Sequence, residues 1–508
     1  MPFEFIDNTT AIDRTSRKRI RSHVATGKNA NKTLTRPSKA LALKDSSAAA
    51  PFHVPSCLRK TQAQKSQEEK NKNTRESASS SRSNVEIEIG IDRQWDDGLL
   101  FPVPVRGESR YLVHQAIFFF CGIKHNPDLD GALVNPDHTS SVWVRYIFLD
   151  EAYFHCSLAT SILCHRNHRN ETTQGMHHIA RTYRIIQKRL CGNEATSDMT
   201  IAILVVMSQY ERLQGQYARG YIHVKGLRRM VELRGGVVRL SRECWRVMQK
   251  VLRADLEYAL QLGTRTLFGV EGIEALRTSG CVYVDGGKGG ELGSGLALDS
   301  FLQGHLRDEL WMVFSDMRYL GMVIYDAIAG YRQRMDGIEF HSSILLLGHR
   351  LLHINPLGEG EDSGTCADTG LSELENAVHL GLVAFLATFL TGLDHRVLDK
   401  PLLSRRLRLA VENLSSSIEA GEGSRFVQNV RIWILYIGVV GVFKPADDEW
   451  LIPTTEAAMQ SLGLVSWEDV KKTVAGFPWV NVLHDRAGIA LCSAQRMLEF
   501  SNKPDQLP

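Results

Sequence analysis

The sequence lacks the paired cysteines of a zinc-based DNA-binding module. A zinc binuclear cluster needs six thiolates, in two C-x-x-C groups about a dozen residues apart, to hold two zinc ions. The nine cysteines are scattered singly, and the first 120 residues contain only Cys57. This excludes such a cluster from that stretch. The odd, unpaired count predicts reduced thiols in an intracellular protein.

Long hydrophobic runs are also missing. The longest, residues 380–390 and 432–443, are about half of the ~20 residues that a membrane span needs, which predicts buried helices instead. The first ten residues are mixed in polarity and basic residues follow, unlike a secretory signal peptide. The sequence therefore predicts a soluble protein without a membrane partner.

Catalytic and metal-binding patterns are equally scarce. The glycine-rich stretch around Lys288 lacks the order of a phosphate-binding loop, because Lys288 is followed by glycine rather than by a hydroxyl residue. Cys164 and His168 are one helical turn apart, but no pair-plus-pair spacing accompanies them or the nearby His155 and His165. The sequence thus predicts no catalytic residue, no metal site, no cofactor and no enzymatic activity.

The charge is distributed unevenly along the 508 residues. Residues 1–84 hold 17 Lys and Arg against 7 Asp and Glu, whereas the remainder holds 43 against 50. Residues 33–84 are rich in polar and small residues and cannot bury enough apolar surface to offset their chain entropy. We therefore predict a basic, largely disordered tail over 1–84, with a short leader motif at 3–32. A linker over 85–105, in which 85–91 alternates like a strand, leads to a helical domain over 106–503.

The fold class predicted for the body is all-α, as one large irregular multi-helix domain. Strand signals are few, and the helices have no fixed repeat period. Besides the hairpin below, helices are expected at residues 111–121, 142–164, 177–190, 200–213, 301–335, 339–352, 371–393, 400–417, 424–443, 454–462, 467–475 and 486–500.

The most strongly patterned stretch is residues 217–268, which predicts a helical hairpin. Gly235 and Gly236 end the first helix, because glycine accepts the left-handed conformation of a last turn. Ser241 is the predicted N-cap of the second helix and Gly263 its stop. The apolar stripes are Tyr217, Tyr221, Val224, Leu227 and Val231 on the first helix, and Trp245, Met248, Leu252, Leu256 and Ala259 on the second.

This hairpin resembles a known family. His223-x-x-Gly226-Leu227, followed by Arg234-Gly235-Gly236 and a helix with Asp255, is similar to the fungal-specific transcription factor domain, the helical region usually found C-terminal to a zinc binuclear cluster. The tryptophan-rich end, with Trp433, Trp467 and Trp479 in order and spacing, extends the resemblance over most of residues 106–500.

The resemblance implies a helical domain that receives a signal or a partner, resides in the nucleus and modulates transcription. Within it, Asp255 lies on an apolar helix face and needs a partner, for which Arg228, Arg229 and Arg234 are the candidates across the hairpin. His223 is predicted to be a hydrogen-bonded histidine at the hairpin.

The basic segment Arg14, Arg17, Lys18, Arg19 and Arg21 has three interpretations: a nuclear import signal, a nonspecific nucleic-acid contact, or a solvated tail. The first implies a nuclear import receptor and the transcription machinery as partners. DNA would be contacted only weakly, through phosphates, or through a partner. A cytosolic scaffold derived from the same domain is the alternative, and an enzyme a distant third. No sustained heptad repeat indicates an oligomeric state.

Overall fold

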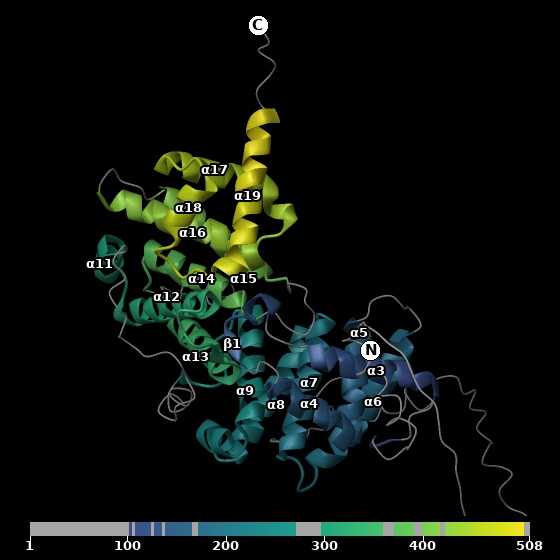
Figure 1. Ribbon diagram of the computed structural model, residues 1–508. Coiled ribbons are helices and arrows are strands. Elements are labelled where there is room, and N and C mark those ends of the chain that lie inside the picture. The colour runs from purple at the N-terminus through teal and green to yellow at the C-terminus, as the bar shows by residue number, and fades with distance from the viewer. Residues whose placement is uncertain are drawn as a thin grey trace, which may run out of the picture. The chain divides into compact units, whose positions relative to one another are not determined.

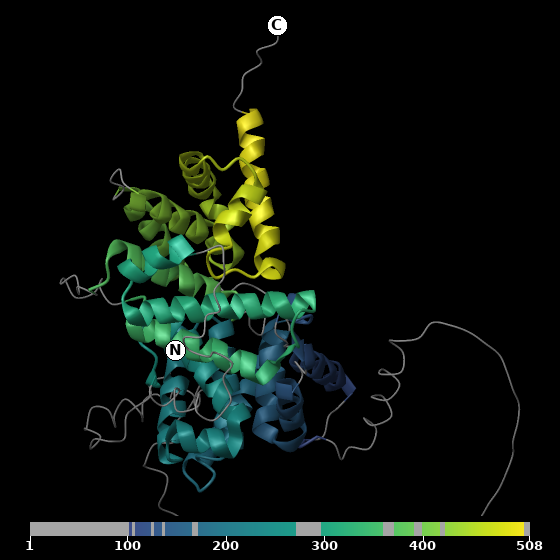
Figure 2. The ribbon, with the colours of Figure 1, turned by 60° about the vertical axis from the view of Figure 1, so that its left-hand side comes forward.

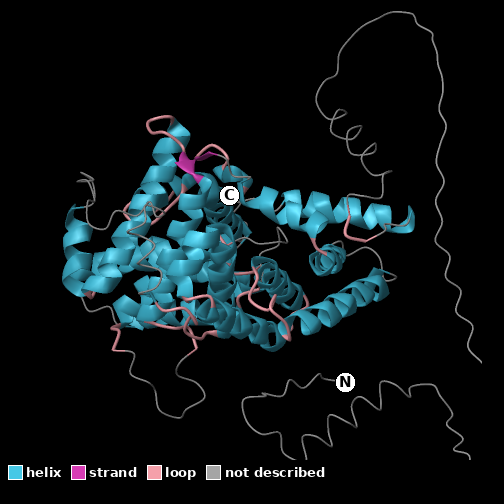
Figure 3. Cartoon of the chain, turned by 90° about the horizontal axis from the view of Figure 1, so that it is seen from below, coloured by secondary structure: helices cyan, strands magenta, loops and turns pink. Residues whose placement is uncertain are grey.

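Helices account for most of the chain described by the computed structural model, which covers residues 101–103, 107–122, 126–134, 138–164, 171–270, 296–358, 370–390, 399–416 and 422–501. Seen from below, these residues are helical except for loops and one short strand pair (Figure 3). The predicted all-α class is confirmed. The predicted strand at 85–91 and the basic leader lie outside the described residues.

The first group of helices runs from residue 107 to residue 262. It comprises α3 (Gly107–Gly122), α4 (His138–Leu149), α5 (Glu151–Cys164), α6 (Glu171–Leu190), α7 (Asp198–Leu213), α8 (Tyr217–Leu233) and α9 (Gly236–Leu262), with the 3₁₀ turn η2 (Pro127–Leu129). Helices α5 and α6 pack together, α5 packs on α7, and α7 packs on both α8 and α9.

The second group follows after residue 295. It comprises α11 (Leu296–His305), α12 (Asp308–Ala329), α13 (Gly337–Ile354), α14 (Glu373–Ala387), α15 (Pro401–Ser416), α16 (Glu422–Gly441), η3 (Pro445–Asp447), α17 (Asp448–Leu462), α18 (Trp467–Val474) and α19 (Asn481–Ser501). Helix α16 contacts α14, α15, α17, α18 and α19, and is therefore the centre of this group.

Helices α12 and α13 join the two groups. They lie between the blue and teal helices of the first group and the green to yellow helices of the second (Figures 1 and 2). Helix α13 packs on α9 and on α14. A short parallel pair reinforces the junction, since β1 (Leu133–Val134) pairs with β2 (Met335–Asp336).

The apolar runs 380–390 and 432–443 are buried, as predicted, within and just beyond α14 and α16. The side chains of Leu382, Ala384, Ile434 and Leu435 are fully buried. None of the described helices combines the length and the hydropathy needed to span a bilayer.

Two predicted helices are each divided. The helix expected at 142–164 is broken at Asp150, whose carboxylate accepts a hydrogen bond from the Tyr153 amide (2.9 Å) and pairs with Arg189 (2.5 Å). The carboxylate thus begins α5 as a new helix. The helix expected at 301–335 is broken before Asp308, where the Arg307 amide bonds to Glu375 of α14 (2.8 Å). In both places a polar tertiary contact replaces a turn of helix.

The prediction of Ser241 as a helix N-cap is wrong. Helix α9 begins directly at Gly236, and Ser241 lies inside it, where its hydroxyl donates to the Val237 carbonyl (2.7 Å). Gly235 and Gly236 have φ of 91° and 90°, so the chain turns there without any intervening loop. Cys244 has φ of −150° and marks a kink in α9. The predicted stop at Gly263 (φ 73°) is confirmed.

Candidate functional site

The α7–α9 corner, residues 198–262, carries the motif residues that the sequence singles out between His223 and Asp255. Leu227 is fully buried. A Cβ added at Gly226 would meet only the Leu204 side chain, at an ordinary 3.6 Å. The left-handed Gly235 and Gly236 are different, because a side chain at either position would strain the backbone. Within the motif, the glycine pair is thus required by geometry and Gly226 is not.

His223 is a buried packing residue. Its ring lies 6.1 Å from the ring of Tyr183, whose hydroxyl donates to Glu211 (2.6 Å). Burial, helped by the nearby Arg219, lowers the pKa of His223 to about 4, so the ring is neutral at physiological pH. The predicted hydrogen-bonding role is wrong, since the ring makes no hydrogen bond to the described residues. The ring packs near the ring of Tyr183 instead of facing a hydrogen-bonding group.

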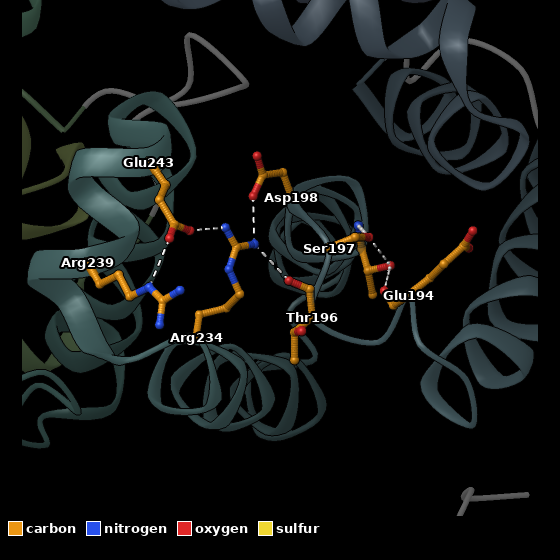
Figure 4. Close-up of polar contacts among 8 residues, drawn as sticks. Glu194, Thr196, Ser197, Asp198, Arg234, Arg239 and Glu243 are labelled. Carbon is orange, nitrogen blue, oxygen red and sulfur yellow. Dashed lines mark hydrogen bonds and ion pairs between the residues drawn. The ribbon is translucent and has the colours of Figure 1, made fainter.

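Arg234 holds three helices together at the end of α8 (Figure 4). Its guanidinium donates to the Thr196 carbonyl (2.9 Å) and to Asp198 (2.8 Å) at the start of α7, and to Glu243 (2.5 Å) on α9. Arg239 contacts the other oxygen of Glu243 (2.9 Å). Arg234 therefore fixes the angle of the corner.

Replacing Arg234 by methionine is expected to lower the free energy of unfolding by about 1–2 kcal/mol, because three charge-assisted hydrogen bonds are lost at a partly exposed site. Chemical unfolding measures the change. Arg228→Met is the matched control, because Arg228 pairs with Glu232 on an exposed helix face and should leave stability unchanged. Equal losses in both variants would contradict the assigned role.

The predicted partner of Asp255 is corrected by the structure. Its buried carboxylate accepts hydrogen bonds from the amides of Leu267 (2.8 Å) and Phe268 (3.0 Å), and lies 3.5 Å from His349 Nε2. None of the three arginine candidates reaches it: Arg228 and Arg229 pair with Glu232, and Arg234 is occupied as described. Asp255 therefore fastens the segment that follows α9 onto the helix, which is a structural role.

Gly220 and Tyr258 form a contact that the sequence does not reveal. The Tyr258 ring lies against the backbone of α8, where a Cβ at Gly220 would stand 1.7 Å from the phenolic oxygen. That hydroxyl donates to the Ser208 carbonyl of α7 (2.6 Å). One side chain of α9 thus joins all three helices of the corner.

A group of charged side chains, some buried and some partly buried, lies beside this contact. We name it the Glu257 cluster: Arg212, Lys250, Arg253, Glu257 and Lys400. Glu257 accepts from Arg212 (2.5 Å) through one oxygen and from Arg253 (2.9 Å) through the other. Although burial alone raises the pKa of Glu257, the two guanidinium groups lower it overall. The sequence does not reveal this cluster; its only signal is a stripe of charge at 250, 253 and 257 on an amphipathic helix.

Of the histidines near Cys164, the structure describes His155, which pairs with His178 of α6. His155 Nδ1 and His178 Nδ1 are 2.8 Å apart and the rings stack, so one ring donates its Nδ1–H to the other. Burial lowers the pKa of both, that of His178 to about 4. Among the described residues, no group of three or more His, Cys, Asp or Glu side chains is arranged to hold a metal ion. His165 and His168 lie outside the described residues.

The tryptophan-rich end is a packing core. Trp433 is fully buried, stacks on Phe477 (5.1 Å) and donates to the Pro478 carbonyl (3.1 Å). Trp479 donates to Asp485 (2.8 Å). Trp467 packs over α19 so closely that a Cβ at Gly488 would lie 2.4 Å from its ring. These residues hold α16, α18 and α19 together.

The fold and the corner define an all-helical protein in which the motif residues shape a helix junction and a charged cluster is buried beside it. Compared with protein-family models, with curated proteins and with solved structures, the chain matches none. Its function is therefore inferred from its own residues.

Proposed function

We propose that the chain is a transcription regulator similar to proteins with the fungal-specific transcription factor domain. The helical body serves as the regulatory domain, and the segment from Arg14 to Arg21 directs nuclear import. The observation that carries the proposal is the α7–α9 corner. Several residues of the resemblance, spaced along α8 and α9, have definite roles at one junction: a left-handed glycine pair, the Arg234 bonds and the Asp255 anchor.

The import signal is tested by the location of a fluorescent fusion of the full chain. Replacing Arg17, Lys18, Arg19 and Arg21 by alanine is expected to shift the fusion from the nucleus to the cytosol, because import receptors bind clustered cations. Replacing Lys39, Lys44, Arg59 and Lys60 removes the same charge elsewhere in the tail and should leave the fusion nuclear. A fusion that is cytosolic in every form would contradict the proposal and favour the alternative of a cytosolic scaffold.

A second measurement separates nuclear presence from a role in transcription. The full chain is tethered to a reporter promoter through a foreign DNA-binding domain. We expect transcription of the reporter to change by several-fold, up or down. A nuclear fusion that leaves the reporter unchanged would contradict the regulatory role while leaving the import signal intact.

A further inference from the structure

Counted over the side chains that the structure describes, the Glu257 cluster holds more positive than negative charge. Arg212 and Arg253 share the two oxygens of one carboxylate, so one negative charge faces two guanidinium groups. Lys250 lies on the same stripe of α9, one turn before Arg253 and two turns before Glu257. Lys400, just before α15, is close enough to feel the charges of Arg212 and Glu257, and its ammonium lies 3.4 Å from the Gly441 carbonyl of α16.

Two of these cations have donors without an acceptor. The ammonium of Lys250 makes no hydrogen bond or ion pair with any residue that the structure describes. Arg212 is only 8% exposed, and its Nε is buried without a partner. A buried donor such as Arg212 Nε is costly when it is left unsatisfied. Arg212 is held in place by Glu257 and by Gln209 (3.0 Å).

The neighbouring carboxylates face other partners. Glu211 is bonded to Tyr183 and paired with Arg219 (3.3 Å). Asp255 faces backbone amides and His349. Asp399 pairs with Lys444 (2.5 Å). The positive charge of the cluster therefore acts on its own lysines. Burial is the larger cause and the adjacent arginines the smaller one, and together they lower the pKa of Lys250 and of Lys400 to about 8.

We propose that the Glu257 cluster binds a small oxyanion with at least two negative charges, a phosphate or a polycarboxylate. Lys250 Nζ and Arg212 Nε supply unused donors, and Lys400 supplies a third charge from the other group of helices. An anion here would connect α7 and α9 with α15 and α16. This inference goes beyond the proposed function and does not depend on nuclear location.

The test uses the full chain in a buffer of monovalent ions, with ionic strength held constant by sodium chloride. Citrate and inorganic phosphate are titrated separately, and binding is followed by calorimetry and by the midpoint of thermal unfolding. We expect one of the two to bind saturably and to raise the midpoint. Citrate alone would identify a polycarboxylate site and phosphate alone a phosphate site. Saturation by neither overturns the proposal.

The variant Lys250→Gln makes the test specific. It is expected to weaken anion binding at least tenfold, while raising the anion-free unfolding midpoint, because it removes an unpaired, partly buried charge. The matched control Lys188→Gln changes an exposed lysine of α6 and should alter neither. If Lys250→Gln instead lowers the anion-free midpoint and leaves anion affinity unchanged, the lysine is satisfied within the chain and the proposal fails.

The pH dependence of anion binding provides an independent test. Because the two lysines lose their charge as the pH rises through about 8, affinity for the anion should fall at least tenfold between pH 7 and pH 9.5. In Lys250→Gln this fall should be smaller, since one of the two titrating groups is gone. An affinity independent of pH contradicts the assigned donors.

Discussion

Replacing Gly220 by alanine is expected to lower the free energy of unfolding by about 2–4 kcal/mol, although alanine is the better helix former. The added methyl group would stand 1.7 Å from the Tyr258 hydroxyl and 2.5 Å from the ring carbon that bears it. Tyr258 is fully buried, so the ring cannot simply move into solvent. Either α8 moves away from α9, or the hydrogen bond from Tyr258 to Ser208 breaks.

Gly226→Ala is the matched control, in the same helix. Its methyl group would meet Leu204 at an ordinary 3.6 Å, so the substitution should be neutral or stabilise the protein by up to about 1 kcal/mol through helix propensity. Urea unfolding of both variants gives the comparison. If the two variants have the same stability, the close approach of α8 to Tyr258 is wrong.

A double-mutant cycle with Tyr258→Phe shows whether the tyrosine itself is responsible. Tyr258→Phe alone should cost about 1 kcal/mol for the bond to Ser208. In the double mutant Gly220→Ala/Tyr258→Phe, the loss of stability should be smaller than the sum of the two single losses, because the phenolic oxygen, the closest atom of the clash, is absent. Part of the loss remains, since the ring carbons also lie within 3 Å of the added methyl group. Strict additivity would place the strain elsewhere.

Periodicity predicts the helices of this protein well, but not their interruptions. The stripe from Trp245 to Ala259 and the stop at Gly263 follow from local pattern alone, because burying an apolar face and closing a helix are decided within a few residues. The breaks at Asp150 and Arg307 are set by Arg189 and Glu375, which are distant in sequence. A single sequence gives no means of pairing such residues.

The same limit explains the errors at the corner. Proximity across the hairpin suggests an arginine for Asp255, whereas its carboxylate accepts from the amides of Leu267 and Phe268, after the end of α9, and lies near His349 of α13. Gly226 belongs to the motif but has ordinary space around it, and Gly220, outside the motif, has none. The resemblance identifies the corner, and only tertiary contacts show which of its residues are indispensable.

Three buried histidines are expected to make the protein unstable in mild acid. Burial lowers the pKa of His223 and His379 to about 4 and that of His484 to about 3. His484 also depends on being neutral, because its Nδ1 accepts the Val480 amide (3.0 Å). His379 donates Nε2–H to the Leu351 carbonyl (3.0 Å), and its Nδ1 is buried without a partner. A second proton has no acceptor at either site.

The sign follows from linkage. Above pH 6.5 these rings are neutral in both states and contribute nothing to the pH dependence. As the pH falls below 6.5, these histidines become protonated in the unfolded chain but stay neutral in the folded chain. Stability is therefore lost progressively until the pH reaches the pKa values of the folded state. At pH 5 each of the three histidines costs about 2 kcal/mol, or about 6 kcal/mol together. That is a large part of the 5–15 kcal/mol typical of a folded protein.

The variant His379→Gln isolates the contribution of one histidine to this pH dependence. Glutamine can keep the bond to Leu351 but never takes up a proton, so the loss of stability between pH 7.5 and pH 5 should shrink by about 2 kcal/mol. This difference does not depend on whether the variant is more or less stable at pH 7.5, because only the change with pH is compared. His353→Gln, at an exposed position of α13, serves as the control for the substitution itself. Urea unfolding at closely spaced pH values measures all three proteins.

A wild-type profile that is flat from pH 7.5 to pH 5 would mean that these histidines accept protons in the folded protein, and that α14 and α19 open locally to let them do so.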